Sequence, residues 1–326
     1  MGKNFQIIFD DIQEGIWFQG LNDDFKESEL ISIAEGRKAY PEIEKTLKYD
    51  RPDIILADNG VPILVIERTV EVPSGHNVGQ RFGRIAAAAE EGIPSIYLFP
   101  YVAFKHGGAT KGPRYVNLRL FNAFEIMENE LEGAITTINW PVDQGYEVIK
   151  SPEKDVRIKE YLNLFLELYY DKVPDINEAI KNSGFHKREI SERNIFALTK
   201  VKRKKVYDGP PSSVNIVPVE RLHKSPLARK YGLKFNEDIS KFDELVIYKI
   251  GMTYVRSDPY TGTAMLYRHL YIEGYDECKR GLYLLIPDIS IADWKAVDEN
   301  RKDVRLYSEV ADGILLKDGY ISFINY

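Results

Sequence analysis

Residues 52–69 read PDIILADNGVPILVIERT. The stretch holds two apolar runs, 54–57 and 61–66, with the turn sequence Asp-Asn-Gly between them. Short apolar runs bounded by turn signals predict buried strands, and Asn-Gly is the strongest short-range signal of a hairpin. A hairpin places the start of its first strand beside the end of its second. The sequence therefore predicts that Asp53 and Glu67 are neighbours at one edge of a sheet.

A buried apolar hairpin has no structural need of a carboxylate on each arm. Two carboxylates at one sheet edge supply the hard oxygen ligands that Mg²⁺ prefers. The same two residues also allow a plainer interpretation, in which Asp53 and Glu67 only cap the ends of their strands.

The segments around the hairpin predict an α/β chain. Asn22-Asp23-Asp24 predicts the start of a helix, and glycine after residue 91 predicts the end of another. The expected helices cover about 26–38, 42–47, 78–91, 116–131 and 154–170, the expected strands 53–57, 61–70 and 94–99, and residues 4–20 are ambiguous. A helix that crosses between the strands around it implies a parallel pairing beside the antiparallel hairpin. We therefore expect a mixed β-sheet flanked by helices.

The second half of the chain predicts a further α+β region. Probable strands cover 245–255, 264–272 and 282–286, and the turn sequence Asp-Pro-Tyr-Thr-Gly stands at 258–262. With 326 residues the chain has room for about two domains of roughly 150 residues each. We expect a first domain at 1–150 and a second domain at 151–326.

Composition excludes several classes of protein. The chain is 44% hydrophobic and 29% charged, which is ordinary for a globular protein. It lacks a run of eighteen apolar residues and an apolar N-terminal signal core, so we expect a cytoplasmic protein. Its single cysteine excludes internal disulfides and a cysteine-rich zinc site, and its five histidines form no His-x3-His pair.

The charge is unevenly distributed along the chain. The net charge is −6, but residues 200–234 contain ten Lys or Arg and two acids, a local charge of +8 against −14 for the rest. A basic segment on an acidic background is typical of a protein that grips phosphates locally, although it also suits a solvated surface loop.

Asp53 after a proline, the hairpin, and Glu67 two positions before Thr69 resemble the PD-(D/E)xK nuclease superfamily, which includes most type II restriction endonucleases. The resemblance covers about residues 25–104, in the order helix, strand, strand, helix, strand. It implies a restriction-endonuclease-like core, with Asp53 and Glu67 as ligands of Mg²⁺. It also implies Thr69, and Gln80 of the following helix, as further catalytic residues.

The chain departs from the family pattern at one position. The family usually has a lysine where this sequence has Thr69, and threonine cannot supply a positive charge. Strand alternation points Arg68 to the opposite face. The remaining candidates to compensate are Glu71, the helix residues Gln80, Arg81 and Arg84, and Glu35 or Glu42 from the first helical region.

The predicted DNA contacts lie in three places. The candidates are Arg81 and Arg84 on the helix, Lys202, Arg203 and Lys204 in the basic segment, and Arg256 and Arg268 beside the C-terminal turn. Lys105, His106 and Lys111 lie in a glycine-rich loop that suits phosphate contact and a plain surface loop equally well.

The function that this sequence predicts is a site-specific, Mg²⁺-dependent endonuclease (deoxyribonuclease) that cuts double-stranded DNA as a homodimer. We expect the PD-(D/E)xK-like nuclease domain at 1–150 and a DNA-recognition and dimerisation domain at 151–326. Thr69 favours an alternative, a DNA-binding protein whose nuclease core is catalytically degenerate. A soluble enzyme of another class has no Walker or Rossmann glycine pattern to support it.

Overall fold

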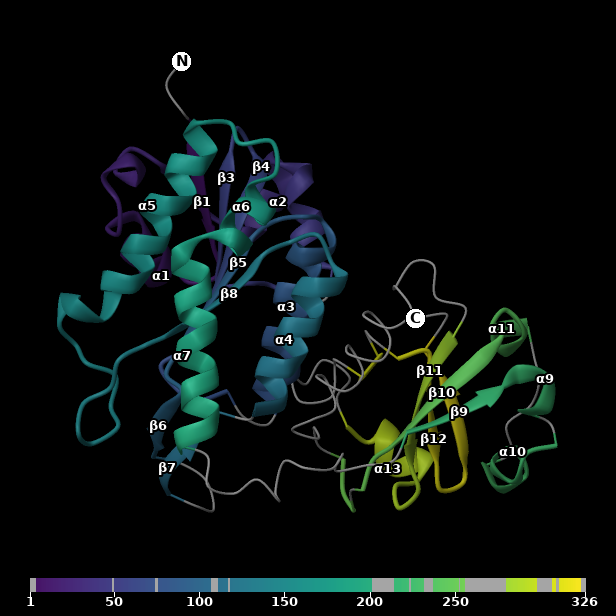
Figure 1. Ribbon diagram of the computed structural model, residues 1–326. Coiled ribbons are helices and arrows are strands. Elements are labelled where there is room, and N and C mark those ends of the chain that lie inside the picture. The colour runs from purple at the N-terminus through teal and green to yellow at the C-terminus, as the bar shows by residue number, and fades with distance from the viewer. Residues whose placement is uncertain are drawn as a thin grey trace. The chain divides into compact units, whose positions relative to one another are not determined.

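The computed structural model describes residues 4–48, 50–73, 76–106, 111–116, 118–200, 214–222, 224–231, 237–251, 253–255, 280–297, 307–308 and 311–323. The chain forms two compact units (Figure 1). The first comprises Met1–Pro73 and Gly83–Lys204, and the second comprises Ser74–Phe82 and Lys205–Tyr326. The first unit thus continues through the helices that follow residue 150.

A six-stranded mixed sheet forms the centre of the first unit. Its strands are, in spatial order, β2 (Glu29–Ser32), β1 (Phe5–Phe9), β3 (Ile54–Asp58), β4 (Val61–Arg68), β5 (Ser95–Phe99) and β8 (Ile135–Asn139). The β1–β3 and β3–β4 pairs are antiparallel, whereas β2–β1, β4–β5 and β5–β8 are parallel. The predicted mixed sheet flanked by helices is confirmed.

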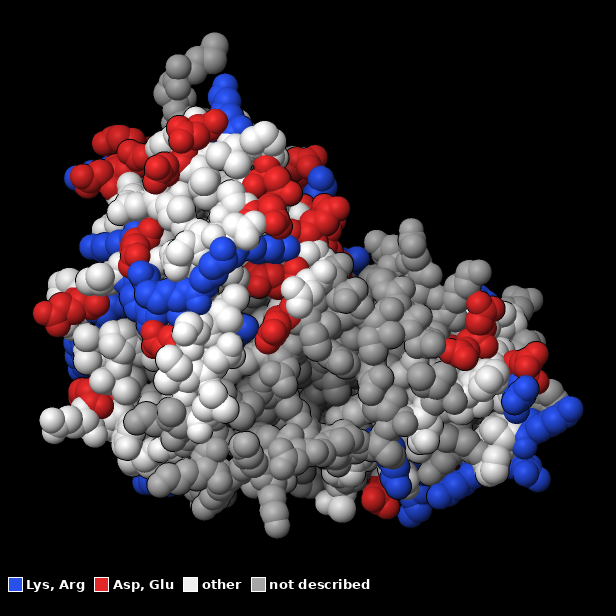
Figure 2. All heavy atoms as spheres, in the orientation of Figure 1, with Lys and Arg blue, Asp and Glu red and all other residues white. Residues whose placement is uncertain are grey.

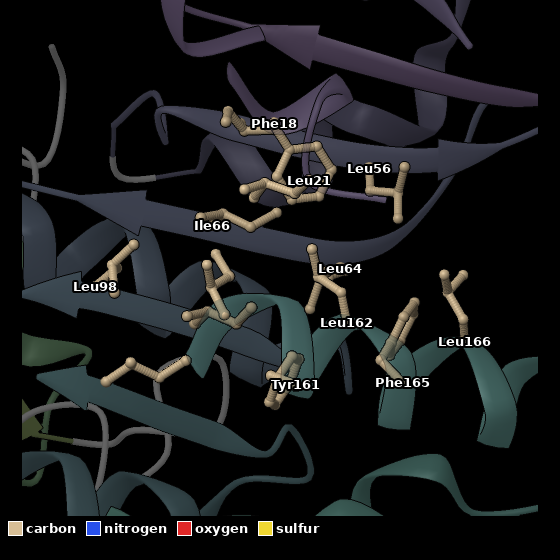
Figure 3. Packing of buried hydrophobic residues seen from close by; sticks show 14 of the residues in the cluster. Phe18, Leu21, Leu56, Leu64, Ile66, Leu98, Tyr161, Leu162, Phe165 and Leu166 are labelled. Atoms are coloured by element: carbon tan, nitrogen blue, oxygen red, sulfur yellow. The ribbon is translucent and has the colours of Figure 1, made fainter. Parts of the chain in front are cut away.

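Helices cover both faces of this sheet because successive strand residues point to opposite sides. Ile54, Leu56, Leu64 and Ile66 pack with the buried residues of α1 (Ile12–Gln19) and α5 (Val156–Tyr170), as Figure 3 shows. The alternate positions face α2 (Ile33–Ala39), the 3-10 helix η2 (Pro41–Leu47) and α3 (His76–Glu90). The remaining helical segments of this unit are η1 (Asp23–Phe25), α4 (Leu118–Glu130), η3 (Pro152–Asp155), α6 (Ile176–Asn182) and α7 (Gly184–Lys200).

The predicted hairpin is present with its predicted turn. Ile54 pairs with Ile66, and the two central turn residues have positive φ angles, 52° at Asn59 and 79° at Gly60. Positive φ at both central positions is the geometry of a type I′ turn, which suits the twist of two adjoining strands. The hairpin therefore fixes which residues of the two arms lie opposite each other.

Two other predictions near the hairpin are wrong. The predicted helix at 26–38 is a strand, β2, followed by the short helix α2, whose start is fixed by a capping box between Ser32 and Glu35. Pairing with β1 outweighs the local helical pattern there. The glycine-rich loop, expected to run from Lys105 to Arg114, is shorter than that, because Lys105 ends the strand β6 (Val102–Lys105) and Gly112 begins its partner β7 (Gly112–Tyr115).

The second unit holds a mixed five-stranded sheet, again as expected of an α/β chain. Its strands are, in spatial order, β13 (Gly319–Ser322), β12 (Gly313–Leu316), β11 (Arg280–Ile286), β10 (Glu244–Lys249) and β9 (Val214–Pro218). The helices of this unit are α9 (Val219–Leu222), α10 (Pro226–Tyr231), α11 (Glu237–Ser240) and α13 (Ile291–Lys295).

The predicted strands at 245–255 and 282–286 correspond to β10 and β11, although β10 ends at Lys249. The predicted strand at 264–272 and the turn at 258–262 lie outside the described residues. Across the ranges that the structure describes, none of the helices has the length and apolar character needed to cross a membrane.

Candidate active site

The two acids of the hairpin meet at one edge of the first sheet. Asp53 immediately precedes β3. Glu67 is the second-last residue of β4, one position beyond the Ile54–Ile66 pair. Asp53 is 8% exposed and Glu67 is fully buried. Ionised carboxylates are costly to bury without a cation, so the site needs positive charge.

Arg84 of α3 supplies a positive charge to both acids. Its Nη1 lies 3.2 Å from Asp53 Oδ1 and 2.9 Å and 3.0 Å from the two oxygens of Glu67. Its Nε donates to Asp50 Oδ2 at 3.1 Å. Burial by itself lowers the pKa of the Arg84 guanidinium, but the carboxylates of Glu67, Asp50 and Asp53 outweigh this and raise it.

Asp53 is also held by the main chain of β4. The backbone N–H of Arg68 donates to Asp53 Oδ2 at 2.8 Å. One oxygen of this carboxylate therefore accepts from the strand and the other from α3. The two arms of the hairpin thus fix the direction of the Asp53 side chain.

The side chain of Arg68 lies on the other face of the sheet, as strand alternation predicts. Its Nε donates to Glu14 Oε1 at 3.0 Å, and its guanidinium carbon lies 4.6 Å from the ring centre of Trp17. Burial, and then the nearby negative charge of Asp53, raise the pKa of Glu14. Glu14 and Arg68 therefore form an ion pair on the face of the sheet opposite to Arg84.

The donor chemistry of the site suits a divalent cation. Arg84 Nη1 marks a single point that lies within 3.2 Å of oxygens from both Asp53 and Glu67, so both carboxylates reach a common centre. On this face of the sheet, the carboxylates of Asp50, Asp53 and Glu67 all lie within 3.2 Å of the Arg84 guanidinium. Mg²⁺ needs only one or two protein carboxylates because water completes its coordination.

A closed cage of protein ligands is not part of this site. In the part of the chain that the structure describes, no group of three or more His, Cys, Asp or Glu side chains is placed to hold a metal ion. The residues fit a loosely held hydrated cation, with Arg84 as its neighbour or competitor.

Thr69 lies at the edge of the site in a turn. Its N–H donates to the carbonyl oxygen of Leu98 at 2.9 Å, which extends the β4–β5 pairing, and its Oγ1 accepts from the N–H of Glu71 at 3.2 Å. The Thr69 hydroxyl thus stabilises the turn after β4. Glu71 is exposed, and the turn carries it away from the strand.

The other predicted site residues separate into three groups. Glu35 caps α2 and Glu42 pairs with Lys45 at 2.9 Å, so neither is bonded to the acids of the hairpin. Arg81 is half-buried on α3, three positions before Arg84. The side chain of Gln80, and all of Lys202, Arg203, Lys204, Arg256 and Arg268, lie outside the described residues.

Sequence reasoning missed two acids, Asp50 and Glu14. Asp50 stands three positions before Asp53, and this proximity was a usable signal. Glu14 carries no such signal, because only the fold brings α1 against β4. Arg84 was predicted both as a residue that could compensate for Thr69 and as a DNA contact, and the structure places it beside the acids.

No protein-family model, curated protein or solved structure matches this chain. The resemblance to the PD-(D/E)xK superfamily therefore stays a prediction that rests on the residues of the hairpin and their order.

Proposed function

We propose that this protein is a Mg²⁺-dependent endonuclease that hydrolyses double-stranded DNA, of the type II restriction-enzyme kind. The observation that carries the proposal is the meeting of Asp53 and Glu67 around one point at the edge of the sheet. Two carboxylates that reach a common point are the hard oxygen ligands that Mg²⁺ takes, with water completing its coordination.

The roles of the residues follow from their contacts. Asp53 and Glu67 hold the cation, and the Arg68 N–H fixes the direction of Asp53. A bound Mg²⁺ polarises a phosphodiester and lowers the pKa of a coordinated water. Arg84 keeps the two carboxylates together and brings a permanent positive charge to the place where the phosphate charge develops.

Arg84 compensates for Thr69 in this proposal. A threonine carries no charge, and the Thr69 hydroxyl already accepts a hydrogen bond from Glu71. The guanidinium of Arg84 is in direct contact with both acids. It is therefore the candidate for the electrostatic role that the family assigns to lysine.

One observation favours a second candidate function. Arg84 neutralises part of the acid cluster without any metal, which is what a DNA-binding protein with a degenerate nuclease core needs for stability. The two candidates differ in what Asp53 does.

Cleavage of plasmid and phage DNA by the wild type and by Asp53→Ala, with Mg²⁺ or Mn²⁺, tests the proposal. We expect cleavage by the wild type and a loss of at least about 100-fold in the variant, with DNA binding retained. A wild type that binds DNA and leaves methylated and unmethylated substrates uncut supports the degenerate core instead.

A further inference from the structure

A long segment without acids follows the crossover helix. Residues 92–124 contain no Asp or Glu, although fifty acids in 326 residues would place about five in a stretch of this length. The same segment contains four Lys or Arg residues and His106. Its charge is opposite in sign to that of the whole chain.

The centre of this segment is the hairpin of β6 and β7. Ala103 pairs with Arg114 and Lys105 pairs with Gly112, so Lys105 and Arg114 lie on the same face of the hairpin. Lys111 is exposed and immediately precedes β7. Like charges on the same face of a hairpin repel each other.

The hairpin leaves the sheet at the same edge as the acids. Glu67 is paired with Tyr97 of β5, and β6 begins five positions after Tyr97. Figure 1 shows β6 and β7 beyond the ends of β5 and β8, at the end of the first unit opposite the β3–β4 turn. A chain advances at most about 3.6 Å per residue, so Lys105 lies within roughly 30 Å of the site.

The two lysines are available for a ligand. Within the described ranges, neither Lys105 nor Lys111 has a carboxylate partner, whereas His106 is paired with Glu147 at 2.6 Å. Figure 2 shows that acidic side chains gather at the other end of the first unit, around the β3–β4 turn. A polyanion is therefore repelled from that end and attracted to the hairpin.

We propose that the β6–β7 hairpin is a clamp for the phosphate backbone of DNA, with Lys105 and Lys111 as its contacts. The inference rests on the proposed function, because it takes DNA to be the polyanion that the acid site cuts. The clamp holds the duplex beside Asp53 and Glu67 without reading its sequence.

Equilibrium binding of a labelled DNA duplex in EDTA, over a range of KCl concentrations, tests the clamp separately from catalysis. The test variant is Lys105→Gln/Lys111→Gln in the full chain. The matched control is Lys38→Gln/Lys172→Gln, which removes the same charge from two exposed positions. Thermal unfolding checks that both variants are folded.

Loss of two phosphate contacts lowers the slope of log Kd against log salt by about 2 and weakens binding on the order of tenfold or more at low salt. We expect this loss in the test variant and wild-type binding in the control. Equal slopes in wild type and test variant, equal losses in both variants, or a wild type without affinity for DNA would overturn the clamp. If the wild type binds DNA and the test variant shows the expected loss, but the wild type does not cleave DNA in Mg²⁺, the nuclease proposal is wrong and the clamp proposal is retained.

Discussion

At the scale of single residues, Arg84 decides how the acid site is stabilised. Removing one partner from a buried charge cluster costs about 3–5 kcal/mol. Arg84→Gln leaves Asp50, Asp53 and Glu67 facing one another. We expect it to lower the free energy of unfolding in EDTA by about this amount.

A divalent cation should restore much of that loss if the acids form a metal site. A ligand at 100 times its Kd stabilises a folded protein by about 2.7 kcal/mol. Urea unfolding with EDTA, Mg²⁺ and Ca²⁺ measures the effect. Arg188→Gln is the control, because Arg188 pairs with Glu160 at the surface, where such pairs contribute at most about 1 kcal/mol. A destabilised Arg84→Gln that no divalent cation rescues argues against the metal site.

Glu14 gives a prediction about pH. Its pKa is raised in the folded chain, chiefly by burial, so the folded state holds its proton more tightly than the unfolded state. The resulting stability is present below the pKa of the unfolded carboxyl and is lost as the pH rises through the folded pKa. In urea unfolding, the free energy of unfolding of the wild type should therefore fall relative to that of Glu14→Gln from about pH 4 upward.

Glu27→Gln, at an exposed position, is the control for that series. A difference between wild type and Glu14→Gln that stays constant from pH 4 to pH 7 is inconsistent with a buried Glu14. Such a result would place this carboxyl in free contact with water.

The residue scale also shows how far sequence reasoning reaches. The pairing of Asp53 with Glu67 could be predicted because an apolar run, an Asn-Gly turn and a second apolar run determine register over a short stretch. Asp50 could also have been predicted at the site, because it stands three positions before Asp53. The contact of Arg84 with both acids depends on the angle at which α3 crosses the sheet, which no local pattern encodes.

At the scale of elements, α3 places Arg84 because its alanines let it lie close to the sheet. Ala86–Ala89 are fully buried, and Ala88 packs with Ile55 and Val65 of the hairpin. The helix predicted at 78–91 begins two residues earlier in the structure and ends one residue earlier. Its small apolar face indicated the helix, and Gly92 indicated its C-terminal end. The β2 strand was missed, since a short edge strand carries little signal before its partner is known.

Ala88→Leu tests this packing. Added methylene groups in a close-packed interior cost about 1–3 kcal/mol, and the strain should tilt α3 and move Arg84 from the acids. We expect lower stability in urea, together with weaker metal-dependent cleavage. Ala34→Leu, at an exposed position of α2, should change stability by no more than about 0.5 kcal/mol. Equal effects of the two substitutions would show that α3 is not tightly packed.

At the scale of the whole molecule, charge is arranged along the first unit. Acidic side chains gather around the β3–β4 turn (Figure 2). The acid-free segment 92–124 begins just before β5, the strand paired with β4, and Tyr97 of β5 lies opposite Glu67. Under the proposed function, this arrangement favours DNA at the edge that holds Asp53 and Glu67. The basic segment 200–234 is visible in the sequence as a run of charge. The place of the β6–β7 hairpin could not be predicted, because only the sheet topology brings it to the edge that holds Asp53 and Glu67.

The arrangement of one acid site per chain leads to a prediction about assembly. Each 37.5 kDa chain carries one Asp53–Glu67 pair, and the two strands of a duplex run in opposite directions. Cutting both strands together needs two sites related by a two-fold axis, so in sedimentation with DNA we expect a complex of two chains with one duplex. Dimers made by co-expressing wild-type and Asp53→Ala chains should nick supercoiled plasmid, whereas wild-type dimers should linearise it. A monomer that linearises plasmid in one binding event would rule out the two-site arrangement, because one acid pair would then cut both strands in turn.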